Sequence, residues 1–128
     1  MTRLLLDSGA VSRLARPSFR TDAIFLAIRQ RGLWPPIVPT VVIVESSTGR
    51  VGADANTNRL LAMCDVVTDL PVAVARRAGQ LRHLAHRGSP VDAIVVALAE
   101  PNGFVLTGDL EDLGALAARA NGVRIERI

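Results

Sequence analysis

Short apolar segments alternate with helical patterns along the whole sequence, and this alternation limits the possible folds more than any other feature. Runs typical of strands lie at 3–6, 37–38, 65–68, 103–106 and 123–127. Patterns typical of helices lie at 8–15, 21–31, 54–63, 71–87, 89–99 and 110–120. Strands separated by helices build parallel sheets that are covered on both faces. Because no repeat or linker divides the 128 residues, we expect one domain over 1–128, an α/β three-layer sandwich with a mostly parallel central sheet.

Capping and turn residues predict where several helices begin and end. Thr21 and Asp54 can cap the helices that follow them, and Gly88 can end the long helix before it. Ser89 and Pro90 suit the N-cap and the first position of the next helix. That helix is nearly all apolar after its first turn, so we expect it to be buried.

The segment after Val38 gives conflicting signals. The β-branched residues Val41–Val44 favour a longer strand, whereas Pro39–Thr40 is typical of a helix start. The choice decides where the carboxylate of Glu45 is placed, and these residues alone leave it open.

Composition excludes several classes of protein. Hydrophobic residues make up 49% of the chain, which is too many for a disordered protein. No apolar stretch approaches the ~20 residues that span a bilayer, and MTRLLLDSGA lacks the pattern of a secretory signal. The single cysteine, Cys64, cannot form a disulfide within the chain and is typical of a reducing compartment. We expect a cytoplasmic protein with no membrane partner.

All fifteen basic residues are arginines, against 12 acidic residues. Guanidinium groups bind phosphate oxygens in a bidentate way, which suits a nucleic-acid partner, although the codon usage of a GC-rich genome would give the same bias. The absence of lysine argues against two other α/β classes. Receiver domains use an active-site lysine, and haloacid-dehalogenase-type phosphatases often do. The latter also open with Asp-x-Asp, whereas Asp7 is followed by Ser8-Gly9.

Four carboxylates stand where ligands bind in parallel sheets. Asp7, Glu45 and Asp109 each come shortly after an expected strand, and Asp92 lies in the first turn of the apolar helix. Ligands bind beyond the carboxyl ends of the strands in such folds. If the first, second and fourth strands are neighbours, the four side chains can converge on one cleft.

Each carboxylate also has a simpler interpretation. Asp7 could cap the first helix, and Asp109 could cap the last one with Asp112 as a capping-box partner. Asp92 could be the capping partner of the serine three residues before it, and Glu45 could be a solvated surface residue. Taken singly, these interpretations are as good as a catalytic one. Capping does not, however, require four acids at one edge of a sheet.

Four clustered carboxylates would repel one another unless a cation lay between them. Oxygen ligands favour a hard divalent ion, Mg²⁺ or Mn²⁺. The sequence has no set of histidines and cysteines with the spacing of a zinc site. The acids therefore predict a magnesium or manganese centre.

Five segments in order resemble the PIN-domain nucleases, and among them the VapC-type toxins of toxin–antitoxin pairs. These segments are LLLDSGA, PTVVIVESSTGR, AVARRAGQLRHLA, SPVDAIVVALA and FVLTGDLEDLGALA. Each one alone is weakly specific, but together they cover essentially the whole chain at compatible spacing. The resemblance implies a PIN-like α/β/α sandwich.

The resemblance also implies a set of site residues. The acidic site would consist of Asp7, Glu45, Asp92 and Asp109. Three of these would hold one or two metal ions, namely Asp7, Asp92 and Asp109. Ser8 and Thr107 match supporting hydroxyl positions, and Asp112 matches an accessory acid. Glu45 would lie on a helix that starts near Thr40.

By the same resemblance, the expected activity is metal-dependent endonucleolytic cleavage of RNA, leaving 3′-hydroxyl and 5′-phosphate ends. An antitoxin would wrap the domain with an apolar segment and insert a basic side chain among the acids. Such domains usually form homodimers, and Phe25 and Ile28 are candidates for the antitoxin groove.

Two alternatives remain open. His83 and His86 could support metal-free cleavage through the RNA 2′-hydroxyl, although we expect exposed helix residues there. The surrounding segment 71–91 has four arginines and no acid before Asp92, which suits either a phosphate-facing patch or a solvated face. The second alternative is a PIN-like module that binds RNA or protein without cutting.

The sequence has only four aromatic residues, Phe19, Phe25, Trp34 and Phe104. We expect all of them except Trp34 to lie in the core. Recognition of single-stranded RNA by base stacking is therefore disfavoured.

Overall fold

A computed structural model describes residues 2–128 and contains a five-stranded sheet in which every strand pair is parallel. The strands are β1 (Leu4–Leu6), β2 (Ile37–Pro39), β3 (Asp65–Val67), β4 (Phe104–Thr107) and β5 (Arg124–Arg127). Their order is β3-β2-β1-β4-β5. The central strand β1 therefore has β2 and β4 as its neighbours, the arrangement that brings the carboxyl ends of these three strands together.

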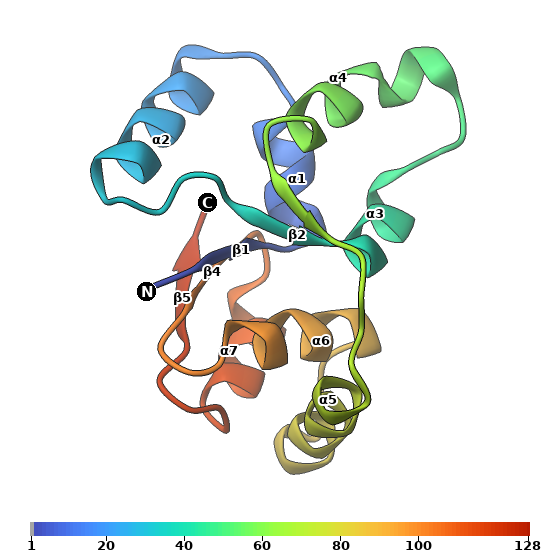
Figure 1. Cartoon of the computed structure of the whole chain (residues 1–128), viewed down its shortest axis with the longest axis vertical. Helices are drawn as coiled ribbons and strands as arrows, with labels where there is room; N and C mark the ends of the chain where they lie inside the picture. Colours follow the sequence, from blue (N-terminus) through green and yellow to red (C-terminus); the bar gives the residue numbers. More distant parts are fainter. Residues whose placement is uncertain (1) are drawn as a thin grey trace.

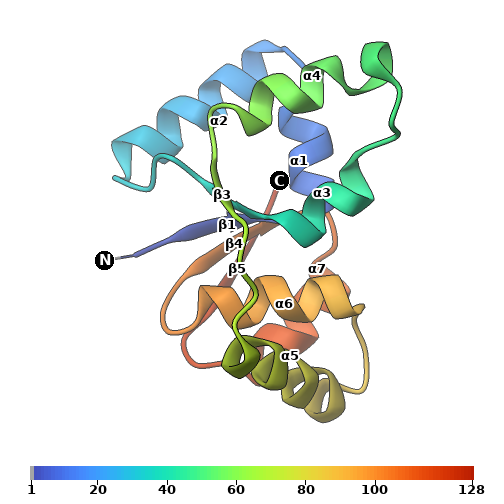
Figure 2. The same cartoon turned by 45° about the vertical axis from the view of Figure 1, so that its right-hand side comes forward.

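Seven helices connect and cover the strands. They are α1 (Ser8–Leu14), α2 (Phe19–Gln30), α3 (Thr40–Ser46), α4 (Val51–Leu61), α5 (Val72–Ala85), α6 (Pro90–Ala99) and α7 (Leu110–Ala117). Helices α1, α2 and α4 lie on one face of the sheet, and α5, α6 and α7 lie on the other (Figures 1 and 2). The predicted three-layer α/β/α sandwich is confirmed, and the sheet is fully parallel.

The core forms between the strands and the apolar sides of the helices. Leu5, Val38 and Val105 of the sheet have no exposed surface. Helix α6 packs against β1 and β4, and Val95 and Val96 within it are fully buried, as its apolar sequence predicts. None of the helices formed by residues 2–128 has the length and apolar character that a bilayer span requires.

Several predicted helix ends were wrong by a few residues, and side-chain hydrogen bonds explain the differences. Ser18, not Thr21, caps α2: the Ser18 hydroxyl accepts a hydrogen bond from the Thr21 amide, and the Thr21 hydroxyl donates to the carbonyl of Arg16. Helix α4 begins before Asp54, whose buried carboxylate accepts hydrogen bonds from the amides of Thr48 and Gly49 instead. Asp54 therefore fixes the loop that precedes its own helix.

The long helix α5 ends two residues earlier than Gly88 predicts. His86 adopts a left-handed conformation, with φ 55° and ψ 24°, and its amide donates to the carbonyl of Arg82. This is a common way to end a helix, although glycine usually occupies such a position. Residues 86–89 then lead into α6, where Ser89 is the N-cap and Pro90 the first residue, as predicted.

The conflict after Val38 is resolved in favour of the helix. Strand β2 stops at Pro39, and α3 begins at Thr40 despite the β-branched residues that follow. Val42 is buried within α3 while Val44 is exposed, so burial follows a helical pattern rather than the alternation of a strand.

One expectation about the aromatic residues was wrong. Phe19, predicted to be in the core, is the first residue of α2 and is 95% exposed. The rings of Phe25 and Trp34 are only partly buried and pack edge to face at 5.5 Å.

Candidate active site

Asp7 is the buried acid at the carboxyl end of the central strand. It follows β1 directly and is only 5% exposed. Its carboxylate caps α1, because Oδ1 accepts a hydrogen bond of 2.8 Å from the amide of Ala10. Burial raises the pKa of Asp7 above its ordinary value, and the hydrogen bonds from Thr107, Ala10 and Gly108 oppose that rise. A carboxylate in this position is favoured by its partners but is poorly solvated.

Thr107 connects Asp7 to the neighbouring strand. The fully buried Thr107 hydroxyl, at the end of β4, donates to Oδ2 of Asp7. The Thr107 hydroxyl oxygen also accepts a hydrogen bond of 2.8 Å from the amide of Asp109. Thr107 therefore orients the Asp7 carboxylate and the backbone of Asp109 at once.

Asp92 approaches Asp7 from α6, which lies on the face of the sheet opposite α1 (Figures 1 and 2). It lies in the first turn of α6, and its negative charge raises the pKa of Asp7 further. Its Oδ2 accepts a hydrogen bond from the amide of Ser89, and the Ser89 hydroxyl accepts one from the Asp92 amide, which is a complete capping box. The capping interpretation of Asp92 is thus correct, and it coexists with proximity to Asp7.

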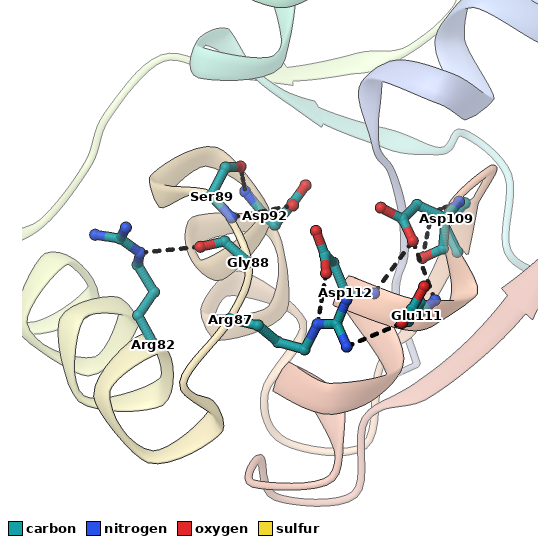
Figure 3. Close-up of polar contacts among 9 residues, drawn as sticks. Arg82, Arg87, Gly88, Ser89, Asp92, Asp109, Glu111 and Asp112 are labelled. Carbon is teal, nitrogen blue, oxygen red and sulfur yellow. Dashed lines mark hydrogen bonds and ion pairs between the residues drawn. The ribbon is translucent and has the colours of Figure 1, made fainter.

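Asp109 and Asp112 stand at the start of α7, where Figure 3 shows both on the side that faces Asp92. Oδ1 of Asp109 accepts hydrogen bonds from the amides of Glu111 and Asp112, so Asp109 is the N-cap of α7. Asp112 does not complete a capping box, because the Asp109 amide bonds to Thr107 instead. The Asp112 carboxylate is held by Arg87, whose Nε lies 2.7 Å from its Oδ1.

Glu45 and Ser8 are less engaged. Glu45 lies on α3, which begins directly after β2 and packs against α1, and its side chain is exposed. Ser8 is the half-buried first residue of α1. Neither side chain forms a hydrogen bond within residues 2–128. Both lie at the expected edge of the sheet, but no contact in this part of the chain ties them to Asp7.

The acidic side chains at this edge of the sheet can be compared with the ligands that a divalent ion requires. Within residues 2–128, no group of three histidine, cysteine, aspartate or glutamate side chains is already gathered at metal-binding distance. The chemistry nevertheless fits a hard cation, since Asp7, Asp92 and Asp109 offer oxygen ligands only. Oδ1 of Asp92 and Oδ2 of Asp109 accept no hydrogen bond from the described residues. Asp92 and Asp109 are thus each held through one oxygen while the other stays available for a ligand, whereas both oxygens of Asp7 already accept a hydrogen bond.

The histidines lie outside this acidic site. His83 and His86 are exposed on α5, with ring centroids 6.0 Å apart, as expected for surface helix residues. They line a hollow of about 370 Å³ whose other lining residues are Gly79, Arg82, Arg87 and Gly88. We call this the histidine hollow.

The two antitoxin-groove candidates differ in exposure. Ile28 is only 5% exposed and belongs to the core, so in this structure it offers little surface to a partner. Phe25 is partly buried and lines a smaller hollow between α2 and α4.

Two solved structures share this fold. A chain of DNA-bound VapBC from Salmonella typhimurium is 18% identical, with a TM-score of 0.71, and the match covers 99% of this chain and 98% of that one. PAE2754 from Pyrobaculum aerophilum is 19% identical, with a TM-score of 0.63 and coverage of 97% and 90%. No family model and no curated protein matches the sequence. The PIN-like fold predicted from the sequence is confirmed, since the likeness extends over nearly the full length of both chains.

Sequence reasoning missed two features of this edge. Gly9 and Gly108 approach each other closely: a Cβ on Gly9 would lie 3.3 Å from the Gly108 nitrogen and 3.5 Å from Oδ1 of Asp7. The glycines in LLLDSG and LTGD were a signal for such an approach. No sequence pattern predicted the hydrogen bond between Arg87 and Asp112, because it joins residues 25 positions apart that meet only when α5 and α7 pack together.

Proposed function

We propose that this chain is a metal-dependent endoribonuclease that acts as the toxin of a toxin–antitoxin pair. The observation that carries the proposal is the buried Asp7 at the carboxyl end of β1, oriented by Thr107 and close enough to Asp92 for the two charges to interact. Asp109 follows the adjacent strand at the same edge. The fold shared with a chain of DNA-bound VapBC supports the same assignment.

The acids would divide the work as follows. Asp7, Asp92 and Asp109 would hold one or two Mg²⁺ or Mn²⁺ ions. When bound, such ions lower the pKa of a water and neutralise the phosphate. Thr107 fixes the Asp7 carboxylate, and the two capping interactions fix Asp92 and Asp109. Exposed Glu45 would orient water, and the products would carry 3′-hydroxyl and 5′-phosphate ends.

The rest of the proposal concerns partners. An antitoxin would cover apolar surface and place a basic side chain among the acids, and the chain would pair into a homodimer. Exposed apolar side chains on α2 and at the starts of α4 and α5 are available for such contacts, among them Phe19, Leu26, Val51 and Val72.

Cleavage of structured RNA by purified protein tests the activity. Wild type should cleave in Mg²⁺ and stop with a chelator, and Asp92→Asn should lose at least about 100-fold in rate. Asparagine keeps the capping oxygen, so the fold should survive. Asp69→Asn, an exposed acid beyond β3, is the matched control and should cleave normally.

The same assay separates the alternatives. Cleavage that persists in chelator and disappears in His83→Asn would support metal-free chemistry instead. An inactive wild-type protein that still binds RNA would support the non-catalytic module. Inducible expression of wild type against Asp7→Ala in a bacterial host, with total RNA examined for fragments, tests toxicity.

A further inference from the structure

A second basic hollow lies beside the acidic site, on the side away from α5. It has a volume of about 430 Å³ and is lined by Gly9, Arg13, Arg20, Gly108, Arg127 and Ile128. We call it the arginine hollow. Its residues come from α1, α2, the β4–α7 loop and the end of β5, so four distant segments of the chain contribute to it.

The arginine hollow adjoins Asp7 directly. Gly9 and Gly108 both line it, and a Cβ on Gly9 would lie within 3.5 Å of Oδ1 of Asp7. Arg127 pairs in register with Thr107, the residue whose hydroxyl donates to Asp7. The arginine hollow therefore begins beside Asp7. The two glycines leave backbone open to a ligand there.

The three arginines of the hollow have no acidic partner. The side chains of Arg13, Arg20 and Arg127 are exposed, and none forms a salt bridge or hydrogen bond within residues 2–128. Their positive charges are consequently available to a ligand. Arg16 lies next to Arg13 and Arg20 in an adjoining hollow and extends the same basic surface.

We propose that the arginine hollow binds the phosphates of the RNA strand that flank the cleaved bond. This inference rests on the proposed function for its substrate. Guanidinium groups and exposed backbone match phosphate oxygens. No aromatic side chain lines the hollow, so contacts there read the backbone rather than the bases. Arginine clusters also bind acidic protein motifs, but the position of this hollow directly beside Asp7, through Gly9 and Gly108, favours an RNA strand as its occupant.

The test measures RNA binding separately from cleavage. Full-length protein carrying Asp92→Asn, in chelator, is titrated with a fluorescent single-stranded RNA at several salt concentrations. Replacing Arg13, Arg20 and Arg127 with glutamine should lower the slope of log affinity against log salt by about 2, since each phosphate contact on a single strand adds about 0.7. A control with Arg29, Arg59 and Arg119 changed to glutamine has the same net charge, and its slope should stay that of the parent.

Three outcomes decide between the inferences. If both triple variants keep the parent slope, the arginine hollow is not a phosphate site, whatever the wild type cleaves. If only the hollow variant loses slope but the wild type never cleaves, the hollow stands and the nuclease proposal fails. If poly-glutamate competes as well as RNA and depends on the same arginines, the hollow takes an acidic protein segment and the proposal is overturned. Unchanged thermal midpoints would verify that the variants are folded.

Discussion

The two basic hollows have similar volumes but different chemistry. The histidine hollow contains Arg82 and Arg87, and both guanidinium groups already have partners in the chain: Arg82 donates to the carbonyl of Gly88, and Arg87 pairs with Glu111 and Asp112. Arg77, which lies on α5, is paired with Glu100. The arginine hollow has three guanidinium groups without any such partner within residues 2–128.

The difference shows that a count of arginines does not locate a nucleic-acid surface. The segment 71–91 has four arginines and no acid before Asp92, which in the sequence suited either a phosphate-facing patch or a solvated face. Three of the four are engaged by groups in the folded chain, including acids that lie 23 to 25 residues further along it. An arginine that already neutralises a carboxylate has less charge to offer a phosphate. Most arginines of the segment 71–91 therefore stabilise the fold through contacts within the chain.

The largest expected effect is on stability and concerns Arg77. Its guanidinium makes a bidentate pair with Glu100, with both N···O distances 2.8 Å and side chains only 27% and 11% exposed. Arg77→Gln should lower the free energy of unfolding by about 2 kcal/mol, because Glu100 keeps only its hydrogen bond from the amide of Asn121. Urea denaturation measures the loss. The triple variant of the arginine hollow should lose almost nothing, and an equal loss there would contradict the distinction between the two regions.

The same pair should make stability depend on pH. The guanidinium of Arg77 lowers the pKa of Glu100 in the folded protein. The stabilisation is therefore present above the ordinary pKa of glutamate and disappears as the pH falls through the lower folded value. The gap between wild type and Arg77→Gln should be constant near pH 7 and close in acid. Denaturation curves between pH 7 and pH 3 measure it, and a gap that widens in acid would contradict the assignment.

The layers could be predicted because they depend on local patterns, whereas the neighbourhood of the first, second and fourth strands entered only as a condition. Apolar runs and helical periodicity fix the elements, and acids after the first, second and fourth strands point to one edge. The start of α3 at Thr40 needed the resemblance, because Val41–Val44 alone favours a strand. Ser18 was missed as a cap because Thr21 is an equally suitable residue type nearby. Both residue types suit an N-cap, and in the structure the Thr21 hydroxyl donates to the carbonyl of Arg16 instead.

The candidate site was predicted in part. The sequence offered capping and catalysis as rival interpretations of Asp7, Asp92 and Asp109, yet all three acids cap helices while standing at one edge of the sheet. A carboxylate has two oxygens, so Asp92 and Asp109 each cap through one oxygen and leave the other without a hydrogen bond from the described residues. The glycines after the first and fourth strands were a signal for a close backbone approach, but the pairing of Gly9 with Gly108, 99 positions apart, needed the fold.

A smaller effect is expected where the histidine hollow meets the end of α5. His86 has a positive φ of 55°, a conformation that costs a residue with a Cβ about 1 kcal/mol. His86→Gly should raise the free energy of unfolding by about 0.5 kcal/mol, since the greater freedom of glycine in the unfolded chain offsets part of the gain. His83→Gly, inside the helix, is the opposite control and should destabilise by about 1 kcal/mol. Thermal denaturation of both variants measures the pair, and a fall in stability for His86→Gly would show that its side chain is needed in the hollow.

The smallest expected change in stability is for Arg87, whose pairing with Asp112 places this arginine of the histidine hollow beside the acidic site. Arg87 is exposed, so Arg87→Gln should shift the thermal midpoint by no more than about 2 °C. The substitution removes a positive charge held against Asp112, beside the proposed metal ligands, and should therefore tighten Mg²⁺ binding about threefold. Mg²⁺-dependent shifts of the thermal midpoint measure this in the absence of RNA. Arg59→Gln, on α4 where the side chain bonds to Asn56, changes the net charge equally and should change Mg²⁺ binding less. If both substitutions change it equally, Arg87 acts only through net charge, and its pairing with Asp112 has no separate role at the site.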